Sequence, residues 1–278
     1  MEANRPIFRE RIATESEGGY RHIVDRVGMI ADLLLRRAPD CPVIGVGTPG
    51  AVSTRTGRMK NCNTVCLNGE DLPGDLARRV GRPVYVENDA NCFALAEAIA
   101  GAGRGAALVF GVIMGTGVGG GIVYRGELLQ GLQHIGGEWG HHSIDPDGPS
   151  CYCGQRGCVE RYVSGPAVES LYRERTGRVA SMAAIADRAR AGEPGAAAVF
   201  EQFIDRFGRA LANVISILDP DAVIIGGGLS NIEELYGAGR AAVARCVFND
   251  ELRTPLLPNA LGDSAGVIGA ALLGNRTG

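Results

Sequence analysis

The sequence predicts an α/β fold divided into two lobes. Short apolar runs with strand character alternate along the chain with longer segments whose apolar residues recur every three or four positions. Strands that alternate with helices in this way are typical of α/β domains. The chain has 278 residues, which is enough for two lobes with a core in each. The glycine-rich stretch 101–106 is predicted to join them.

The first third of the chain is expected to hold three strands and two helices. Residues 5–15 alternate enough to form an edge strand. The next apolar residues recur at helical spacing and predict a helix over Ile23, Val24, Val27, Ile30, Leu33 and Leu34. The run 42–52 predicts a buried strand that ends in a Gly/Pro turn, and the run 82–87 predicts another strand. Residues 88–101 predict a helix that starts at a good N-cap and ends at a glycine.

The remainder of the chain is expected to begin with two strands, 106–115 and 119–129, joined by a glycine turn. After a cysteine-rich loop the clearest helix is 199–219, whose apolar face comprises Phe200, Phe203, Ile204, Phe207, Leu211, Val214, Ile215 and Leu218. A strand at 221–228 runs into a helix at 230–243, and 264–274 predicts a closing helix. We therefore expect an N-terminal lobe of residues 1–105, completed by the C-terminal helix 263–278, and a C-terminal lobe of residues 106–262.

Composition excludes several classes of protein. The net charge is −3, and no basic patch or N-terminal helix-turn-helix is visible, so no nucleic-acid partner is expected. No signal peptide and no apolar run of membrane length is found, which excludes a membrane partner and predicts a cytoplasmic protein. Eight cysteines in a cytoplasmic chain are better explained as metal ligands and buried thiols than as disulfides.

One histidine and three cysteines have the spacing of a metal site: His141, Cys151, Cys153 and Cys158 form H-x9-C-x-C-x4-C. Three thiolates and one imidazole complete a tetrahedron and leave no position open for water, which is typical of structural zinc. The alternative is three half-buried thiols in a loop. The pattern favours zinc in a structural role.

Asp89 follows the strand 82–87 and begins the next helix, so two interpretations are open. Its carboxylate could cap the helix N-terminus. It could instead act as a general base, because the carboxyl ends of strands face the cleft in which open α/β sheets bind ligands. The neighbouring Asn88 offers a donor and an acceptor, which suits a ligand rich in hydroxyl groups.

Three glycine-rich turns could also contact ligands. Gly115, Gly117 and Gly120 match G-x-G-x-x-G, but a strand follows instead of a helix, so a dinucleotide site is not supported. That turn, with Thr116, could still hold phosphate oxygens, or it could be a plain hairpin turn. The loop 226–228 could bind a nucleotide or simply link a strand to a helix. The turn 47–50 and the nearby Asn61 and Asn63 could shape a cleft or be ordinary turn residues.

Taken together, these motifs resemble those of the ROK family of bacterial sugar kinases and sugar-responsive repressors. The resemblance rests on G-T-P-G at 47–50, N-D-A-N at 88–91, G-T-G-V-G-G-G at 115–121, E-W-G-H at 138–141, C-Y-C-G-Q-R-G-C-V-E at 151–160 and G-G-G-L-S-N at 226–231. Within the family, residues 61–72, the C-Y-C-G form of the cysteine loop and residues 254–273 look most similar to fructokinases of the manno(fructo)kinase type. The N-acetylglucosamine kinases come next.

The resemblance implies an actin-like ATPase fold of the ribonuclease H-like kind and phosphorylation of a hexose hydroxyl by ATP with Mg²⁺. Asp89 would be the catalytic base. Sugar hydroxyls would be bound by Asn63, Asn88, Glu138, His141 and Glu160. Phosphates would be held at Gly115, Thr116 and Gly117, and adenosine at Gly226, Gly227 and Gly228. His141 would bind zinc through one ring nitrogen and the sugar through the other. A homodimer is also implied.

The N-terminus departs from the family pattern. The family kinases open with an Asp-x-Gly-Gly-Thr motif that contacts phosphates and magnesium, and this motif occurs nowhere in the 278 residues. We therefore expect an N-terminal lobe that lacks its first strands, and a sheet that exposes an unpaired edge or rearranges. Phosphorylation of fructose to fructose 6-phosphate is the first expectation, with poor turnover in this form. The alternatives are an N-acetylglucosamine or glucose kinase, and a sugar-binding protein without catalysis.

Overall fold

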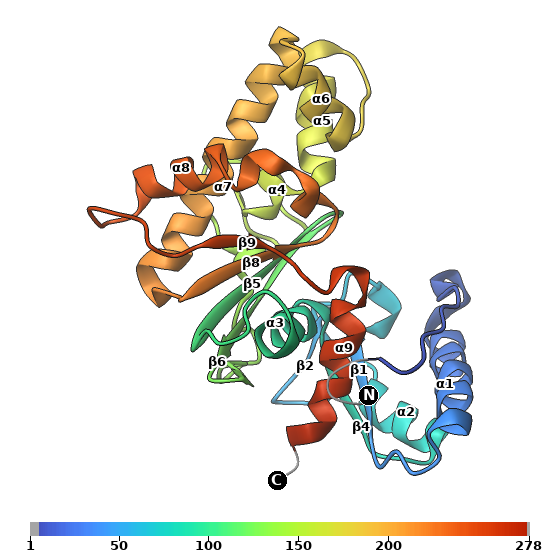
Figure 1. The fold of residues 1–278 in the computed structure, drawn as a ribbon. Helices are drawn as coiled ribbons and strands as arrows, with labels where there is room; N and C mark the ends of the chain where they lie inside the picture. Colours follow the sequence, from blue (N-terminus) through green and yellow to red (C-terminus); the bar gives the residue numbers. More distant parts are fainter. Residues whose placement is uncertain (1–5, 277–278) are drawn as a thin grey trace.

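The structure is a computed structural model that describes residues 6–276 and confirms the α/β fold. The strands are β1 (Ile44–Thr48), β2 (Ala51–Val52), β3 (Met59–Lys60), β4 (Val84–Asn88), β5 (Leu108–Met114), β6 (Val118–Tyr124), β7 (Glu127–Leu128), β8 (Ala222–Gly226) and β9 (Leu256–Pro258). The α-helices are α1 (Gly19–Arg37), α2 (Leu72–Val80), α3 (Asp89–Ala100), α4 (Glu160–Val163), α5 (Gly165–Thr176), α6 (Met182–Arg190), α7 (Pro194–Leu218), α8 (Ala238–Cys246) and α9 (Ala265–Leu272). Figure 1 shows two sheets with helices around and between them.

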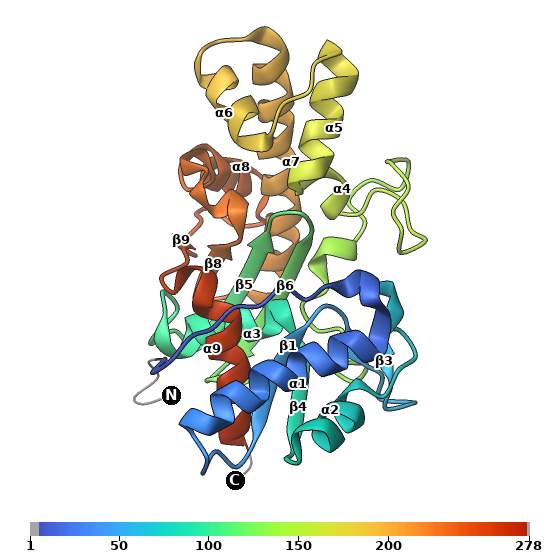
Figure 2. The same cartoon turned by 90° about the vertical axis from the view of Figure 1, so that its right-hand side faces the viewer.

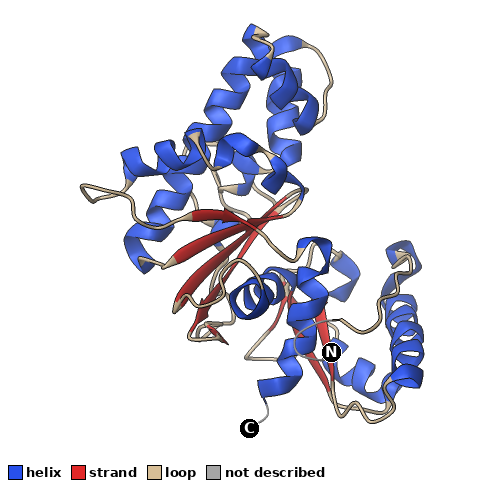
Figure 3. Cartoon of the chain, viewed as in Figure 1, coloured by secondary structure: helices blue, strands red, loops and turns tan. Residues whose placement is uncertain are grey.

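The larger sheet has the strand order β7-β6-β5-β8-β9, with β5, β8 and β9 parallel and β6 antiparallel to β5. Strands β5 and β8 are almost entirely buried because both faces of the sheet are covered (Figure 3). Val223 and Ile225 belong to the core cluster that contains the apolar face of α7. Ile224, which points the other way, packs with α3 and α9. The strand alternation thus builds one core on each face.

The smaller parallel sheet pairs β1 with β4, and its register places Thr48 opposite Asn88. Val46 and Val86 pack against a core formed with α1 and α2. The opposite face lies against α9, where a Cβ on Gly45 would stand 1.7 Å from the carbonyl oxygen of Ala270. Within residues 6–276, β1 pairs with β4 alone, so its other edge carries no strand.

Helices α3 and α9 fill the space between the two sheets (Figure 1). Their backbones touch, since a Cβ on Gly269 would stand 1.7 Å from the carbonyl oxygen of Cys92. Residues 90–98 of α3 are all buried, although the helix has little amphipathic character. A helix that is apolar on all sides is expected where every side is covered. The start of α3 is thereby held between the sheets, next to the ends of β1 and β4.

Three predicted elements were wrong in detail. Residues 6–15 form no strand, because they find no neighbouring backbone to pair with; instead they run past α9 to the start of α1 (Figure 2), and the carbonyl of Ala13 accepts hydrogen bonds from Arg26. The strand predicted at 119–129 is broken by a tight turn at Arg125 and Gly126, both with positive φ. The helix predicted at 230–243 is two short 3-10 turns, η4 (Gly228–Asn231) and η5 (Glu233–Leu235), before α8.

At the C-terminus, helix α9 is followed by the 3-10 turn η7 (Leu273–Arg276). Residues 1–5 and 277–278, which the sequence assigned to the N-terminal lobe and the closing helix, lie outside the described residues. No helix within residues 6–276 is long and apolar enough to cross a membrane.

Candidate functional site

A cavity of about 270 Å³ opens where the carboxyl ends of β1 and β4 face the hairpin β5–β6. This volume is near the lower end of the range of roughly 300–1,000 Å³ typical of ligand pockets. The lining brings together the nine residues that the family resemblance assigned to the base, the sugar or the phosphates: Asn63, Asn88, Asp89, Gly115, Thr116, Gly117, Glu138, His141 and Glu160. Segments that are distant in the sequence therefore meet around one small space.

Asn88 caps helix α3, and this decides what Asp89 can do. The Asn88 side-chain oxygen accepts hydrogen bonds from the N–H groups of Ala90 and Asn91, at 2.9 and 3.3 Å. Its amide nitrogen donates to the carbonyl of Gly50 at 3.1 Å. The sequence left open a capping role for Asp89, but the structure gives that role to Asn88. Asn88 lines the cavity while most of its hydrogen-bonding capacity is used by the fold.

Asp89 lines the cavity and is exposed to solvent there. Burial by the surrounding protein raises the pKa of Asp89, and hydrogen bonds from the backbone N–H groups of Ala90 and of Asp89 itself oppose this effect. No lysine or arginine among the described residues forms an ion pair with it. A carboxylate with a raised pKa and no cationic partner is suited to accept a proton.

The opposite side of the cavity carries Glu138 and His141, held in place by Trp139 between them. These residues belong to the turn η3 (Trp139–His141) and its N-cap. The indole N–H of Trp139 donates to the carbonyl of Gly119 at 2.9 Å, and its ring packs edge-on against Phe110. Burial raises the pKa of Glu138, the charges of Asp89 and Glu160 raise it further, and His141 and Lys60 lower it.

Glu160, the first residue of α4, supports the β5–β6 turn. Its Oε2 accepts the backbone N–H of Val118 at 2.9 Å. A Cβ on Gly117 would stand 2.9 Å from the same oxygen, so the turn approaches the carboxylate closely because residue 117 is glycine. The turn itself is closed by a hydrogen bond of 2.9 Å from the N–H of Gly115 to the carbonyl of Gly117. The second oxygen of Glu160 accepts no hydrogen bond from the described residues.

The loop 226–228 lies beside this turn, outside the cavity lining. β5 and β8 are parallel, with Ile113 opposite Gly226, so their carboxyl ends emerge together. A Cβ on Gly115 would stand 3.7 Å from the backbone nitrogen of Gly228. Gly227 has a φ of 80° and lies against the carbonyl of Met114, a conformation and an approach that favour glycine. The two glycine segments therefore form one continuous backbone surface.

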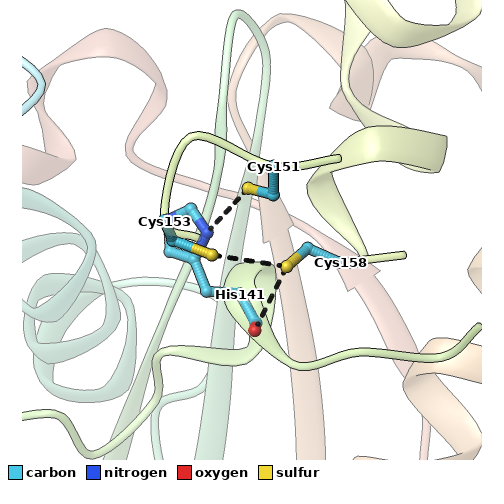
Figure 4. A group of neighbouring side chains, drawn as sticks. All are labelled: His141, Cys151, Cys153 and Cys158. Atoms are coloured by element: carbon cyan, nitrogen blue, oxygen red, sulfur yellow. Dashed lines mark hydrogen bonds between the residues drawn. The ribbon is translucent and has the colours of Figure 1, made fainter. Parts of the chain in front are cut away.

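The four predicted metal ligands do meet (Figure 4). One ring nitrogen of His141 and the Sγ atoms of Cys151, Cys153 and Cys158 all lie within 4.8 Å of one another. The sulfurs of Cys153 and Cys158 are 3.5 Å apart, and Cys151 Sγ is 3.6 Å from Nδ1 of His141. A tetrahedral ion with bonds of about 2.3 Å to sulfur needs ligand separations of roughly 3.8 Å. The donor set and its spacing therefore fit zinc.

Burial raises the pKa of the Cys158 thiol to about 12. A bound divalent cation has the opposite effect, because coordination favours the thiolate. A divalent cation bound among these thiols would therefore stabilise the cluster.

Tyr152 is a cavity residue that the sequence reasoning missed. It stands between two predicted ligands, and its hydroxyl lies 3.0 Å from Nε2 of His141, the nitrogen that faces away from the cysteines. The two rings pack edge-on, and the tyrosine is 71% exposed. Nothing in the spacing of the cysteines shows which way the residue between them points. The folded conformation of the cysteine loop brings the tyrosine hydroxyl to the histidine ring.

Comparison with known proteins agrees with this arrangement. The chain has the ribonuclease H-like, actin-like ATPase fold, which it shares with solved ROK kinases. Within it, the chain belongs to the ROK family, whose family model matches residues 3–277.

Three relatives are especially similar. The N-acetyl-D-glucosamine kinase of Yersinia pseudotuberculosis is 38% identical over 284 aligned residues, which cover 96% of this chain and 91% of the relative. The ROK hexokinase of Thermus thermophilus has a TM-score of 0.86 at 33% identity and covers 96% of this chain and 91% of its own. A ROK family glucokinase of Streptomyces griseus, in complex with glucose and AMPPNP, has a TM-score of 0.84 at 31% identity, with coverages of 99% and 94%.

Proposed function

We propose that this protein is an ATP-dependent hexose kinase. The observation that carries the proposal is the position of Asp89, which faces the β5–β6 turn and the Glu138–His141 turn across one cavity. A sugar hydroxyl bound there has a base beside it and a phosphate-binding turn within reach. The Streptomyces griseus relative, which binds glucose and AMPPNP, supports the same pair of substrates.

Asp89 takes the proton in the proposed reaction. The sugar oxygen attacks the γ-phosphorus of ATP as its O–H bond breaks, and the proton passes to the Asp89 carboxylate. The new O–P bond forms while the bond from the γ-phosphorus to the β-γ bridging oxygen breaks, and ADP leaves. ATP enters as its Mg²⁺ complex, which neutralises phosphate charge. The backbone N–H groups around Gly115–Gly117 would hold the phosphates, and Gly226–Gly228 would adjoin the nucleoside.

Sugar recognition falls to the groups that the fold leaves open. The second oxygen of Glu160 and both oxygens of Glu138 can accept sugar hydroxyls. Asn63 also lines the cavity. The amide nitrogen of Asn88 donates one hydrogen to Gly50, so it has one left for a ligand. The role of Asn88 in binding is therefore smaller than that of the two glutamates.

N-acetylglucosamine or glucose is a better candidate for the hexose substrate than fructose. The sequence motifs pointed first to fructose and gave the aldohexose kinases as the alternative. The similar proteins include an N-acetyl-D-glucosamine kinase and a glucokinase, which favours that alternative.

Zinc, held by His141, Cys151, Cys153 and Cys158, would have a structural role, because four protein ligands fill a tetrahedron. When bound, it would hold the His141 ring in the orientation seen here, with Nε2 towards Tyr152 and the cavity. The homodimer and the cytoplasmic location remain predictions.

A coupled ADP-release assay across N-acetylglucosamine, glucose, mannose and fructose tests the proposal. We expect the first two sugars to give the highest kcat/KM. Calorimetric titration with the same sugars should run in parallel. Sugar binding without ADP release from any of them would contradict a kinase and favour the non-catalytic sugar-binding protein. A preference for fructose would contradict the choice of hexose.

A further inference from the structure

Glu97, in the last turn of α3, is a fully buried carboxylate outside the cavity. Its Oε2 accepts the backbone N–H groups of Ala102 at 2.8 Å and Ala260 at 3.1 Å. Its Oε1 accepts the N–H of Leu261 at 2.9 Å. Among the described residues no lysine or arginine pairs with it, so backbone dipoles alone compensate its charge.

The three N–H groups belong to two separate connecting segments of the chain. Ala102 lies in the connection 101–107, which leads from α3 into β5. Ala260 and Leu261 lie in the connection 259–264, which leads from β9 towards α9. These two connections join the five-stranded sheet to the α3–α9 pair between the sheets (Figure 1). One side chain therefore ties both connections to the same helix.

We infer that Glu97 is a positioning residue for catalysis, which fixes α3, and with it Asp89, relative to the β5–β6 turn. The inference rests on the proposed kinase function. Asp89 and Glu97 stand at opposite ends of one rigid helix, eight positions or about 12 Å apart along its axis. A tilt of about 5° at the Glu97 end moves the Asp89 end by roughly 1 Å. A displacement of that size can lower a catalysed rate by about 100-fold.

The arrangement needs a carboxylate. Glutamine has the same shape but only one acceptor oxygen, and its NH₂ group would face an N–H donor. Gly101 shows how closely the carboxylate is enclosed, since a Cβ there would stand 2.0 Å from Oε2. Two substitutions can thus disturb the same contact by different means. Glu97→Gln removes an acceptor, and Gly101→Ala displaces an unaltered carboxylate.

Hydrogen–deuterium exchange tests the contact without requiring turnover. In Glu97→Gln and in Gly101→Ala, peptides that cover 101–107 and 259–264 should exchange at least about tenfold faster than in the unaltered protein. The matched control is Asp221→Asn. The Asp221 carboxylate also accepts two backbone N–H groups, those of Ala107 and Leu108 at the start of β5, so in this control exchange should stay unchanged at residues 101–106 and 259–264. Unchanged exchange at both connections in both variants would overturn the inference.

Steady-state kinetics tests the consequence for catalysis. We expect kcat to fall by roughly 10- to 100-fold in Glu97→Gln while the KM for sugar changes by less than about threefold. The control Asp221→Asn should keep its kcat. A variant that only melts at a lower temperature, with kcat unchanged below that temperature, would overturn a positioning role. If the unaltered protein releases no ADP, the proposed function fails, and the exchange experiment alone decides whether Glu97 ties the connections.

Discussion

The two ends of helix α3 carry two carboxylates that the fold treats differently. Glu97, at the last turn, accepts three backbone N–H groups and is closed off from solvent. Asp89, at the first turn, accepts only neighbouring backbone N–H groups of its own turn and faces the cavity. The N-cap that Asp89 could have provided is supplied by Asn88. The carboxylate used for architecture is closed off and filled by backbone donors from distant segments, whereas the one available for chemistry keeps an open side.

The same contrast exists within single side chains on the other side of the cavity. One oxygen of Glu160 holds the N–H of Val118, and the other has no partner among the described residues. Nδ1 of His141 faces the cysteines, whereas Nε2 faces Tyr152 and the cavity. Each of these residues has one atom fixed by the fold and one atom turned to the cavity. This arrangement orients each side chain and leaves one of its polar atoms available to bind a ligand.

Asp89→Asn is expected to have the largest effect. The amide keeps the shape and the hydrogen bond from Ala90 but cannot take a proton. Loss of a general base typically lowers the rate by 10²–10⁴-fold, so kcat should fall by about that factor while sugar affinity changes little. ADP release and calorimetric titration measure the two quantities. If kcat falls less in Asp89→Asn than in Glu97→Gln, the distinction between the two ends of α3 is wrong.

Cys153→Ser tests whether the orientation of the His141 ring depends on a metal ion bound at Nδ1. One of four ligands is removed, so bound zinc, measured by elemental analysis, should fall well below one ion per chain. The KM for sugar should rise by roughly 10-fold or more, because His141 loses its fixed orientation. Cys246→Ser is the matched control, since Cys246 is likewise exposed but lies outside the cluster. Full activity in a zinc-free Cys153→Ser protein would show that the ion does not orient the site.

Tyr152→Phe tests whether Nε2 of His141, the nitrogen that faces the cavity, binds the sugar. The tyrosine hydroxyl occupies Nε2, where a sugar hydroxyl is proposed to bind, so the sugar must displace it. Removal of this hydrogen bond, worth about 0.5–1.5 kcal/mol, should lower the KM for sugar by roughly 2- to 10-fold without a change in kcat. A higher KM would mean instead that the hydroxyl itself contacts the sugar.

Much of this site could be predicted from the sequence, because its motifs are local. The Cys/His spacing, the strand that ends at Asn88 and Asp89, and the glycine turn at 115–117 each depend on residues close together in the chain. The family motifs placed them in one cleft, and the structure brings them into one cavity. The α/β order followed from periodicity alone, since long amphipathic segments such as α7 have a strong signal.

The remainder depends on contacts between distant residues. The hydrogen bonds of Glu97 to Ala260 and Leu261 span more than 160 positions, and no local pattern distinguishes it from other helix residues. Residues 5–15 have the alternation of a strand, but a strand forms only beside a pairing partner. The sequence predicts an N-cap at the start of residues 88–101, but it leaves open whether Asn88 or Asp89 supplies it, because both side chains can cap a helix and they are adjacent.

The smallest expected effect is on thermal stability. Its sign distinguishes a role of Asp89 as a general base from a role in stabilising the N-terminus of α3. Burial raises the pKa of this carboxyl, so between its usual value and the raised one the native state keeps a proton that the unfolded chain has lost. Stability therefore falls as the pH rises through that interval, and the full cost is present above the raised pKa. Asp89→Asn removes this cost, so its melting temperature at pH 8 should exceed that of the unaltered protein.

The gain should be small, because the Asp89 carboxylate still contacts water in the cleft, and it should shrink as the pH is lowered towards the usual range of an aspartate, about 3.9. Thermal melts of both proteins between pH 4 and pH 8 measure it, and each 1 kcal/mol corresponds to roughly 2–4 °C. A lower melting temperature for Asp89→Asn at pH 8 would show that the negative charge stabilises the N-terminus of α3. Asp89 would then serve the fold as Glu97 does, and the contrast between the two ends of the helix would disappear.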